Sequence, residues 1–173
     1  MLDYGLSRMS VDRRQLLLAI GDVSGHGIGP ALLMASARGA LRAMSLGRPA
    51  LAERAARLNR LMAEDAADSG HFMTLFMAEV NTADDTMQWV RAGHDPVYIF
   101  DPQTQQFLER DGPGAALWII DQADFETRSM PFLPGQILVM ATDGIWVAIS
   151  ERIYSRANRA RVPTPIPIPP PGG

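Results

Sequence analysis

The chain has 173 residues, of which 47% are hydrophobic and 20% charged, with a formal net charge of −3. These totals are typical of one globular domain with a real core, and the absence of a basic surplus argues against nucleic acid as a partner. No apolar run approaches the roughly 20 residues that span a bilayer, and the first residues lack the regions of a signal peptide, so we expect a cytoplasmic location.

Two residue types are missing, because the chain has no cysteine and all 16 of its basic residues are arginine. Their absence excludes disulfide frameworks, cysteine phosphatases, cysteine zinc sites, lysine Schiff bases and the lysine of a P-loop. Chemistry based on aspartate, histidine or serine remains.

A hairpin is predicted at the start of the chain, with residues 3 to 11 and 14 to 22 paired around Asp12-Arg13. In this register Asp3 lies directly across from Asp22, at a spacing where two carboxylates repel unless a cation lies between them. A divalent metal would resolve the repulsion. The alternative is that Asp3 is a frayed terminal residue.

The stretch Gly21 to Gly27, read GDVSGHG, follows the apolar run Leu16 to Ile20 and precedes a helical pattern. Its three glycines allow positive φ angles and close approach of a ligand, and Asp22 stands where the strand ends. A carboxylate there suits a hard cation, although an ordinary glycine-rich loop with a capping aspartate has the same spacing.

Two helices follow, from Ile28 to Leu46 and, after Gly47-Arg48-Pro49, to about Ala67. The first has one face of small residues suited to close packing on a sheet, comprising Ala31, Leu32, Ala35, Ala37, Ala40, Leu41 and Met44. The second has an apolar stripe of Leu51, Ala55, Leu58 and Met62. Its opposite face, with Arg54, Arg57 and Arg60, is predicted to be solvated surface and not a phosphate site.

Beyond Ser69-Gly70 the pattern changes to strands separated by turn signals, which predicts a mainly antiparallel, layered α+β fold. The expected strands are Phe72 to Val80, Thr86 to Gly93, Val97 to Phe100, Gln106 to Leu108, Phe125 to Pro131 and Gln136 to Ala141. Thr142-Asp143-Gly144 then places a second acid at a strand end.

The composition breaks after Tyr154, so we expect one domain over residues 1–154 and a proline-rich tail over residues 155–173. Alternating prolines favour polyproline II, and the tail is interpreted as a disordered extension or a reading-frame artefact, with a docking peptide as a third reading.

Five motifs in consistent order resemble the stage II sporulation protein E (SpoIIE) type phosphatase domains of the protein phosphatase 2C superfamily. They are GDVSGHG, Leu33-Met34-Ala35, Phe72-Met73-Thr74-Leu75-Phe76, Ala92-Gly93-His94-Asp95-Pro96 and Ala141-Thr142-Asp143-Gly144-Ile145. The resemblance implies an α-β-β-α sandwich of two mainly antiparallel sheets and a pair of Mg²⁺ or Mn²⁺ ions at one edge. It also implies hydrolysis of phosphoserine or phosphothreonine by a water that the metals activate.

Carried over by motif, Asp22 resembles the carboxylate that bridges both metals, and Val23 would offer its backbone carbonyl to one ion. Asp143 resembles a ligand of the second metal, and Asp3 matches the first or second acid of a motif on the preceding strand. The catalytic residues implied are Asp22 and Asp143.

The histidines and the hydroxyl side chains near these motifs are not predicted to be metal ligands or catalytic residues. His26 and His94 could act on phosphate, but a structural hydrogen bond is the favoured reading of both, and His71 is expected at the surface. Ser24 lacks the elbow of a nucleophilic serine. Thr74 and Thr142 either line the site or fill strands.

The chain also departs from the family pattern, since Val147 stands where a glutamate is usual and the closing segment with its late acidic motif is missing. The fold is therefore expected to be incomplete at its C-terminal end, with weak binding of the second metal. We expect a bacterial signalling phosphatase whose substrate is a phosphorylated protein such as an anti-sigma-factor antagonist, with a homodimer left open. The rival hypothesis is a catalytically impaired domain that binds a partner, and a third is an unrelated interaction domain.

Overall fold

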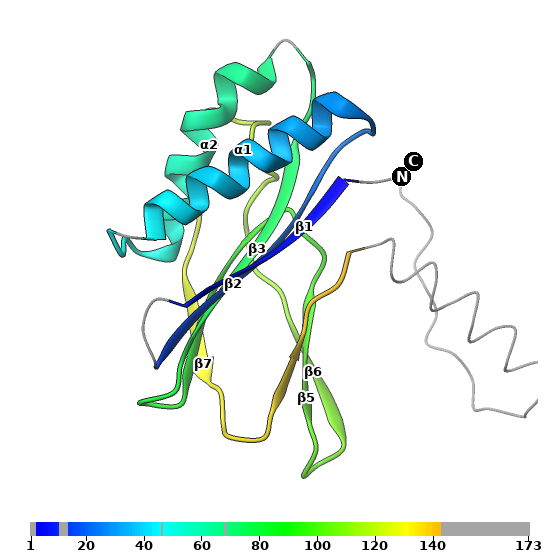
Figure 1. The fold of residues 1–173 in the computed structure, drawn as a ribbon. Helices are drawn as coiled ribbons and strands as arrows, with labels where there is room; N and C mark the ends of the chain where they lie inside the picture. Colours follow the sequence, from blue (N-terminus) through cyan, green and yellow to red (C-terminus); the bar gives the residue numbers. More distant parts are fainter. Residues whose placement is uncertain (1–2, 11–13, 46, 68, 143–173) are drawn as a thin grey trace, which may run out of the picture. The chain divides into compact units, whose positions relative to one another are not determined.

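The computed structural model describes residues 3–10, 14–45, 47–67 and 69–142, the first of these ranges by its backbone. The expected tail over residues 155–173, its boundary at residue 154, Asp143 and Val147 lie outside the described residues. The elements in chain order are β1 (Asp3–Ser10), β2 (Gln15–Val23), α1 (Ile28–Ser45), α2 (Leu51–Ala67), β3 (Met73–Asn81), β4 (Thr86–Ala92), β5 (Val97–Asp101), β6 (Gln106–Arg110), β7 (Arg128–Pro131) and β8 (Ile137–Val139) (Figure 1).

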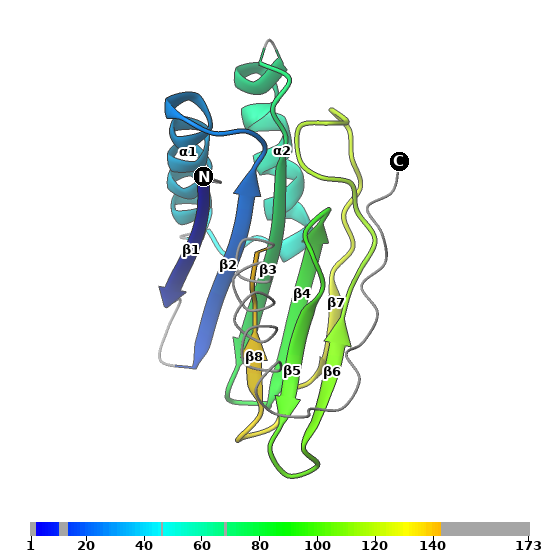
Figure 2. The ribbon, with the colours of Figure 1, turned by 90° about the vertical axis from the view of Figure 1, so that its right-hand side faces the viewer.

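Two antiparallel sheets form the framework, as the sequence predicts. The larger sheet has the strand order β1-β2-β3-β4-β7 and the smaller has the order β6-β5-β8. The two sheets lie one in front of the other in Figure 2. Both β7 and β8 are shorter than the runs predicted for them, Phe125 to Pro131 and Gln136 to Ala141.

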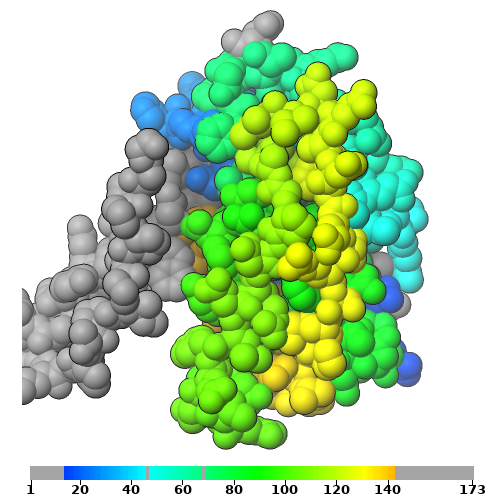
Figure 3. All heavy atoms as spheres, turned by 180° about the vertical axis from the view of Figure 1, so that it is seen from behind, coloured from blue at the N-terminus to red at the C-terminus, as the bar shows by residue number. Residues whose placement is uncertain are grey.

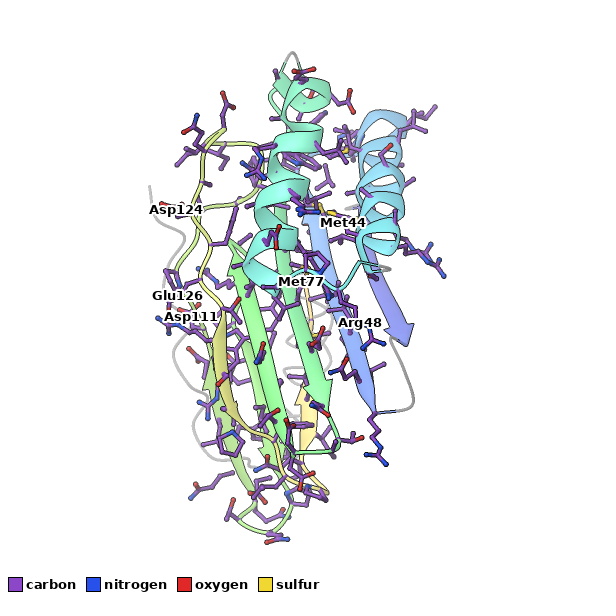
Figure 4. The ribbon with its side chains drawn as sticks, turned by 90° about the vertical axis from the view of Figure 1, so that its left-hand side faces the viewer. Met44, Arg48, Met77, Asp111, Asp124 and Glu126 are labelled. Atoms are coloured by element: carbon purple, nitrogen blue, oxygen red, sulfur yellow. The ribbon has the colours of Figure 1, made fainter. Side chains whose placement is uncertain are left out.

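β3 is buried on both faces because it has a layer on each side. Met73, Leu75 and Met77 belong to the cluster that α1 and α2 cover, whereas Phe76 and Ala78 belong to the cluster between the sheets. Figure 4 shows Met77 with Met44 of α1 on the helix-covered side. The order of layers in the described residues is helices, five-stranded sheet, three-stranded sheet, which explains why β3 is an almost continuous apolar run.

The apolar stripe of α2 is buried as predicted, including Leu51, Ala55, Leu58 and Met62. The predicted small-residue face of α1 is only partly correct, because the helix buries Pro30, Ala37 and Leu41 and leaves Ala31, Leu32 and Ala35 exposed. Within the part of the chain that the structure describes, neither helix combines the length and apolar character needed to cross a bilayer.

The arginine face of α2 is not uniformly solvated, so this prediction is wrong for Arg54. Arg54 is 2% exposed, its Nε donates a hydrogen bond to the Pro49 carbonyl at 2.8 Å, and its Nη2 lies 3.4 Å from Glu79 Oε2 on β3. Arg57 and Arg60 are exposed. Periodicity assigned Arg54 to solvent, but its long side chain lies beneath the helix and links α2 to the sheet.

Candidate active site

Asp22 lies at the end of β2, where the apolar core between the sheets stops. It pairs with Thr74 of β3, one same-face position beyond the pair Ile20 and Phe76, both of which belong to the inter-sheet cluster. Directly opposed residues of antiparallel strands share a face, so Asp22 and Thr74 continue that row beyond the apolar cluster. The Asp22 side chain is half-buried and its Oδ1 atom is shielded from solvent.

Gly21 explains how the strand holds this carboxylate close to β3. A Cβ at position 21 would lie 2.5 Å from Cε of Met73 and 2.8 Å from the Thr74 carbonyl oxygen. Any side chain there would push β2 away from β3 just before Asp22.

His94, in the connection from β4 to β5, is 2% exposed. Its Nδ1 lies 2.9 Å from the Thr74 hydroxyl oxygen, and the Arg91 guanidinium donates a hydrogen bond to its carbonyl. The ring is therefore held by a structural hydrogen bond, the reading that the sequence favours. Arg91, which the sequence analysis did not single out, fixes this turn.

The glycine loop after Asp22 is tied to the start of β3 through Ser24. Its amide donates to the Phe72 carbonyl at 2.9 Å, and its hydroxyl oxygen accepts from the Phe72 amide at 3.0 Å. Gly25 and Gly27 adopt φ angles of 95° and 98°, which favour glycine, and His26 is exposed. Ser24 thus has a structural role.

His71 is less exposed than predicted, because the sequence analysis expects it at the surface. The residue is half-buried, and a Cβ added to Gly25 would lie 2.9 Å from its Cε1 atom. The imidazole therefore packs directly on the glycine loop, a contact between distant positions that no local pattern in the sequence signals.

The predicted pairing of Asp3 with Asp22 is wrong by one residue. β1 and β2 pair so that Asp3 lies opposite Val23 and Tyr4 lies opposite Asp22. The last pair before the turn is Ser10 with Leu16, so five residues connect the paired ends where a two-residue turn was expected. An odd change in the length of the connection shifts the register by one position, so the two acids are not directly opposed.

β8 leads the chain toward the same end of the sandwich. It runs antiparallel to β5, with Val139 opposite Tyr98, so the residues after Val139 proceed toward those that precede β5, where His94 lies. Thr142, the last described residue, is 3% exposed. Asp143 follows it directly in the sequence.

The donor atoms at this edge are oxygens, which suit a hard divalent cation, but the described residues supply too few of them to complete its coordination. Asp22 supplies a partly shielded carboxylate and Val23 a backbone carbonyl, the oxygen donors that Mg²⁺ and Mn²⁺ prefer. In the residues that the structure describes, no group of three His, Cys, Asp or Glu side chains is arranged to hold a metal ion. A complete ligand set therefore requires acids outside the described residues.

The sequence matches one family model over most of its length and a phosphatase of Bacillus subtilis over a shorter range. The family model described as stage II sporulation protein E (SpoIIE) matches residues 12–164. The chain is 26% identical over 134 residues to phosphoserine phosphatase RsbU of Bacillus subtilis (strain 168), an alignment that covers 78% of this chain and 40% of RsbU. The chain thus spans less than half of that relative.

Solved structures show the same fold. The phosphatase 2C (PP2C) domain of SpoIIE from Bacillus subtilis, solved with a fragment of its regulatory domain, matches with a TM-score of 0.74 at 18% identity, covering 93% of this chain and 48% of that one. RsbX in complex with magnesium matches with a TM-score of 0.62 at 14% identity, covering 77% of this chain and 62% of that one. The sandwich is a PP2C-like phosphatase fold.

Proposed function

The chain belongs to the stage II sporulation protein E family, and on that premise we propose that it is a metal-dependent protein serine/threonine phosphatase of bacterial signalling. The observation that carries the proposal is the position of Asp22, a half-buried carboxylate just past the end of the inter-sheet core, where the family motif GDVSGHG supplies it. The similarity to a phosphoserine phosphatase supports the same reaction.

The residues proposed to hold two Mn²⁺ or Mg²⁺ ions are Asp22, Val23 through its carbonyl, and Asp143. Asp3, which the family resemblance also implies, lies opposite Val23 and therefore on the other face of the sheet from Asp22, so it is not proposed as a ligand shared with Asp22. The chemistry supplied by such ions is the acidification of a bound water and the neutralisation of charge on the phosphate. That RsbX was solved with magnesium supports this choice of cation.

The protein's own contribution is to fix the carboxylate. β3 and Gly21 hold the Asp22 backbone, and the hydrogen bond between Thr74 and His94 fixes the neighbouring strand. Because the chain has no cysteine, hydrolysis does not use an enzyme thiol, and a direct attack by water is consistent with the residues present.

The proposed substrate is a phosphoserine or phosphothreonine in a partner protein, specifically an anti-sigma-factor antagonist. The relationship to RsbU and SpoIIE supports this class of substrate. A homodimer and a cytoplasmic location stay predictions from the sequence.

A second candidate is a phosphatase-like domain that binds the phosphoprotein without hydrolysing it. Val147, at a position where the family resemblance implies glutamate, favours it because one fewer carboxylate weakens the hold on a second cation.

The test is phosphate release from phosphoserine, phosphothreonine and phosphotyrosine peptides with Mn²⁺, with and without EDTA. The phosphatase proposal predicts turnover of the first two peptides that EDTA abolishes. Saturable binding of a phosphopeptide with no phosphate release would instead support the binding module.

A further inference from the structure

The segment after β6 crosses the end of the five-stranded sheet beside the candidate site. We call residues 111–121 the strap. In Figure 2 the chain after β6 rises past the end of β4, and Figure 3 shows this region, in yellow-green, on the outer surface. The strap has no helix or extended strand. A long connection that is fixed without regular structure commonly has a functional role.

Successive hydrogen bonds join the strap to β3 and β4. Trp89 Nε1 donates to the Asp111 carbonyl at 3.1 Å, Arg91 Nη1 to the Gly112 carbonyl at 3.1 Å, and the Gly93 amide to the Gly114 carbonyl at 3.0 Å. Further along, Leu117 and Met73 exchange backbone hydrogen bonds of 2.8 and 3.2 Å. The strap is thereby an extra partner for the site ends of both strands.

Asn59 of α2 holds the far end of the strap. The residue is 1% exposed, and its Oδ1 accepts a 2.7 Å hydrogen bond from the Trp118 amide. Its Nδ2 donates to the carbonyls of Ile120 at 2.8 Å and Asp121 at 3.0 Å. One side chain therefore fixes three backbone groups of the strap.

Trp118 needs this support because its φ angle is 72°, in the left-handed region that a bulky residue rarely adopts. Such a conformation persists only where the surroundings impose it, and it occurs preferentially near functional sites. The hydrogen bond that the Trp118 amide donates to Asn59 Oδ1 is a direct way to impose it.

A continuous row of backbone pairs leads from Leu117, the residue before Trp118, to Val23, whose carbonyl is a proposed metal ligand. Leu117 pairs with Met73, Met73 pairs with Val23, and Val23 pairs with Asp3. The adjacent row contains Thr74 and Asp22. A shift of the strap would therefore first displace the end of β3, the strand that pairs with both Val23 and Asp22.

We propose that Asn59 is a positioning residue for the phosphatase reaction, which fixes the strap and through it the end of β3 and the Thr74–His94 pair. The expected effect of Asn59 on turnover rests on the proposed function. Its expected effect on the environment of the His94 ring does not. Asn59 is buried on α2 and does not touch the candidate site, so it acts on the site only through the strap.

The test compares Asn59→Ala with Leu58→Ala in the full chain. Leu58 precedes Asn59 on α2 and is also completely buried, so its truncation destabilises the same helix without removing a bond to the strap. The readouts are the imidazole ¹⁵N signals of His94, assigned with His26→Gln and His71→Gln variants, and kcat and KM for a phosphoserine peptide with Mn²⁺. Both are measured at a temperature where thermal unfolding shows each variant folded.

Asn59→Ala is expected to change the His94 ring signals and to lower kcat by roughly tenfold to a hundredfold, with KM within about twofold. Leu58→Ala is expected to keep wild-type ring signals and a kcat within about twofold. If Asn59→Ala does not fold, Asn59→Asp keeps the acceptor for the Trp118 amide but loses both donated bonds, and is expected to show the same changes.

Wild-type His94 signals in the folded Asn59 variant, or a loss of kcat no larger than in Leu58→Ala, would overturn the proposal. If the wild-type protein shows no turnover at all, the proposed function fails, and the His94 signals alone decide whether Asn59 positions this end of the sheet.

Discussion

Asp22 of β2 lies directly across from Thr74 of β3, on the face turned toward the second sheet. This pairing places a carboxylate beside a hydroxyl that is already bonded to buried His94, so two strands and one turn meet at a single point. The β1 register excludes Asp3 from that pair, which leaves Asp22 as the acid around which the described part of the site is built.

Thr74→Val is expected to lower the free energy of unfolding by about 1 to 2 kcal/mol, because it leaves Nδ1 of a buried imidazole without its 2.9 Å partner. Thr86→Val is the matched control, since its hydroxyl bonds only to the exposed Asp84 carboxylate, and it should cost less than about 0.5 kcal/mol. Urea unfolding of both variants measures the difference, and equal costs would contradict the structural role of the Thr74–His94 bond.

Comparing Gly93→Ala with Gly70→Ala separates the cost of a positive φ angle from the cost of a steric clash between the new Cβ and the strap. The two glycines have φ angles of 66° and 65°, but a Cβ on Gly93 would lie 2.7 Å from the Ala116 amide nitrogen, whereas nothing lies within 4 Å of one on Gly70. Gly70→Ala should cost about 1 kcal/mol of stability with turnover retained. Gly93→Ala should cost about 1 to 3 kcal/mol more and reduce turnover, because the strap must move. Thermal unfolding and phosphate release test both, and matching results for the two variants would argue against a tight strap.

Glu79→Gln is expected to destabilise the protein by about 2 kcal/mol or more, since it leaves the Arg54 charge buried without its carboxylate partner. The control is Glu53→Gln, which breaks a pair with Arg57 whose side chains are 53% and 48% exposed and should change stability by less than about 0.5 kcal/mol. Chemical denaturation compares the two variants. An equally small effect of both would mean that the charge of Arg54 is solvated.

Asp101 makes part of the stability dependent on pH. The hydrogen bond from Gln136, with those from the Gln103 and Thr104 amides, lowers the pKa of Asp101 below its usual 3.8. A lowered folded-state pKa contributes stability that is present above about pH 4 and lost as the pH falls through the folded value. The stability advantage of wild type over Asp101→Asn should thus shrink on acidification. An NMR titration should also show the pKa of Asp101 rising in Gln136→Ala, and the same value in both proteins would refute this cause.

Regular features of the fold could be predicted from the sequence because they depend on local pattern. The stripe of α2 repeats every three to four residues, and turn residues delimit β4, β5 and β6, so their bounds fell within one or two residues of those expected. Arg54 was misplaced because a long side chain can lie under its own helix, and the β1 register because it depends on the number of residues in the connection.

The site was partly predictable for the same reason. GDVSGHG predicts Asp22 as a candidate metal ligand from its own spacing. The contact of His71 with Gly25 joins residues 46 positions apart, so no local pattern in the sequence signals it. The sequence does contain a signal for Asn59, because it is a polar residue inside the apolar stripe of α2, between Leu58 and Met62. Its partners in the strap could be identified only from the folded structure.

The most direct test of the account is the rate of phosphate release from a phosphoserine peptide, measured against Mn²⁺ concentration for wild type and Asp22→Asn. The substitution preserves the shape of the side chain, so thermal unfolding should show a folded variant. We predict a saturable, Mn²⁺-dependent rate for wild type and a loss of roughly a hundredfold or more for Asp22→Asn. Equal Mn²⁺-dependent rates for the two proteins would contradict the central claim that Asp22 holds the metal.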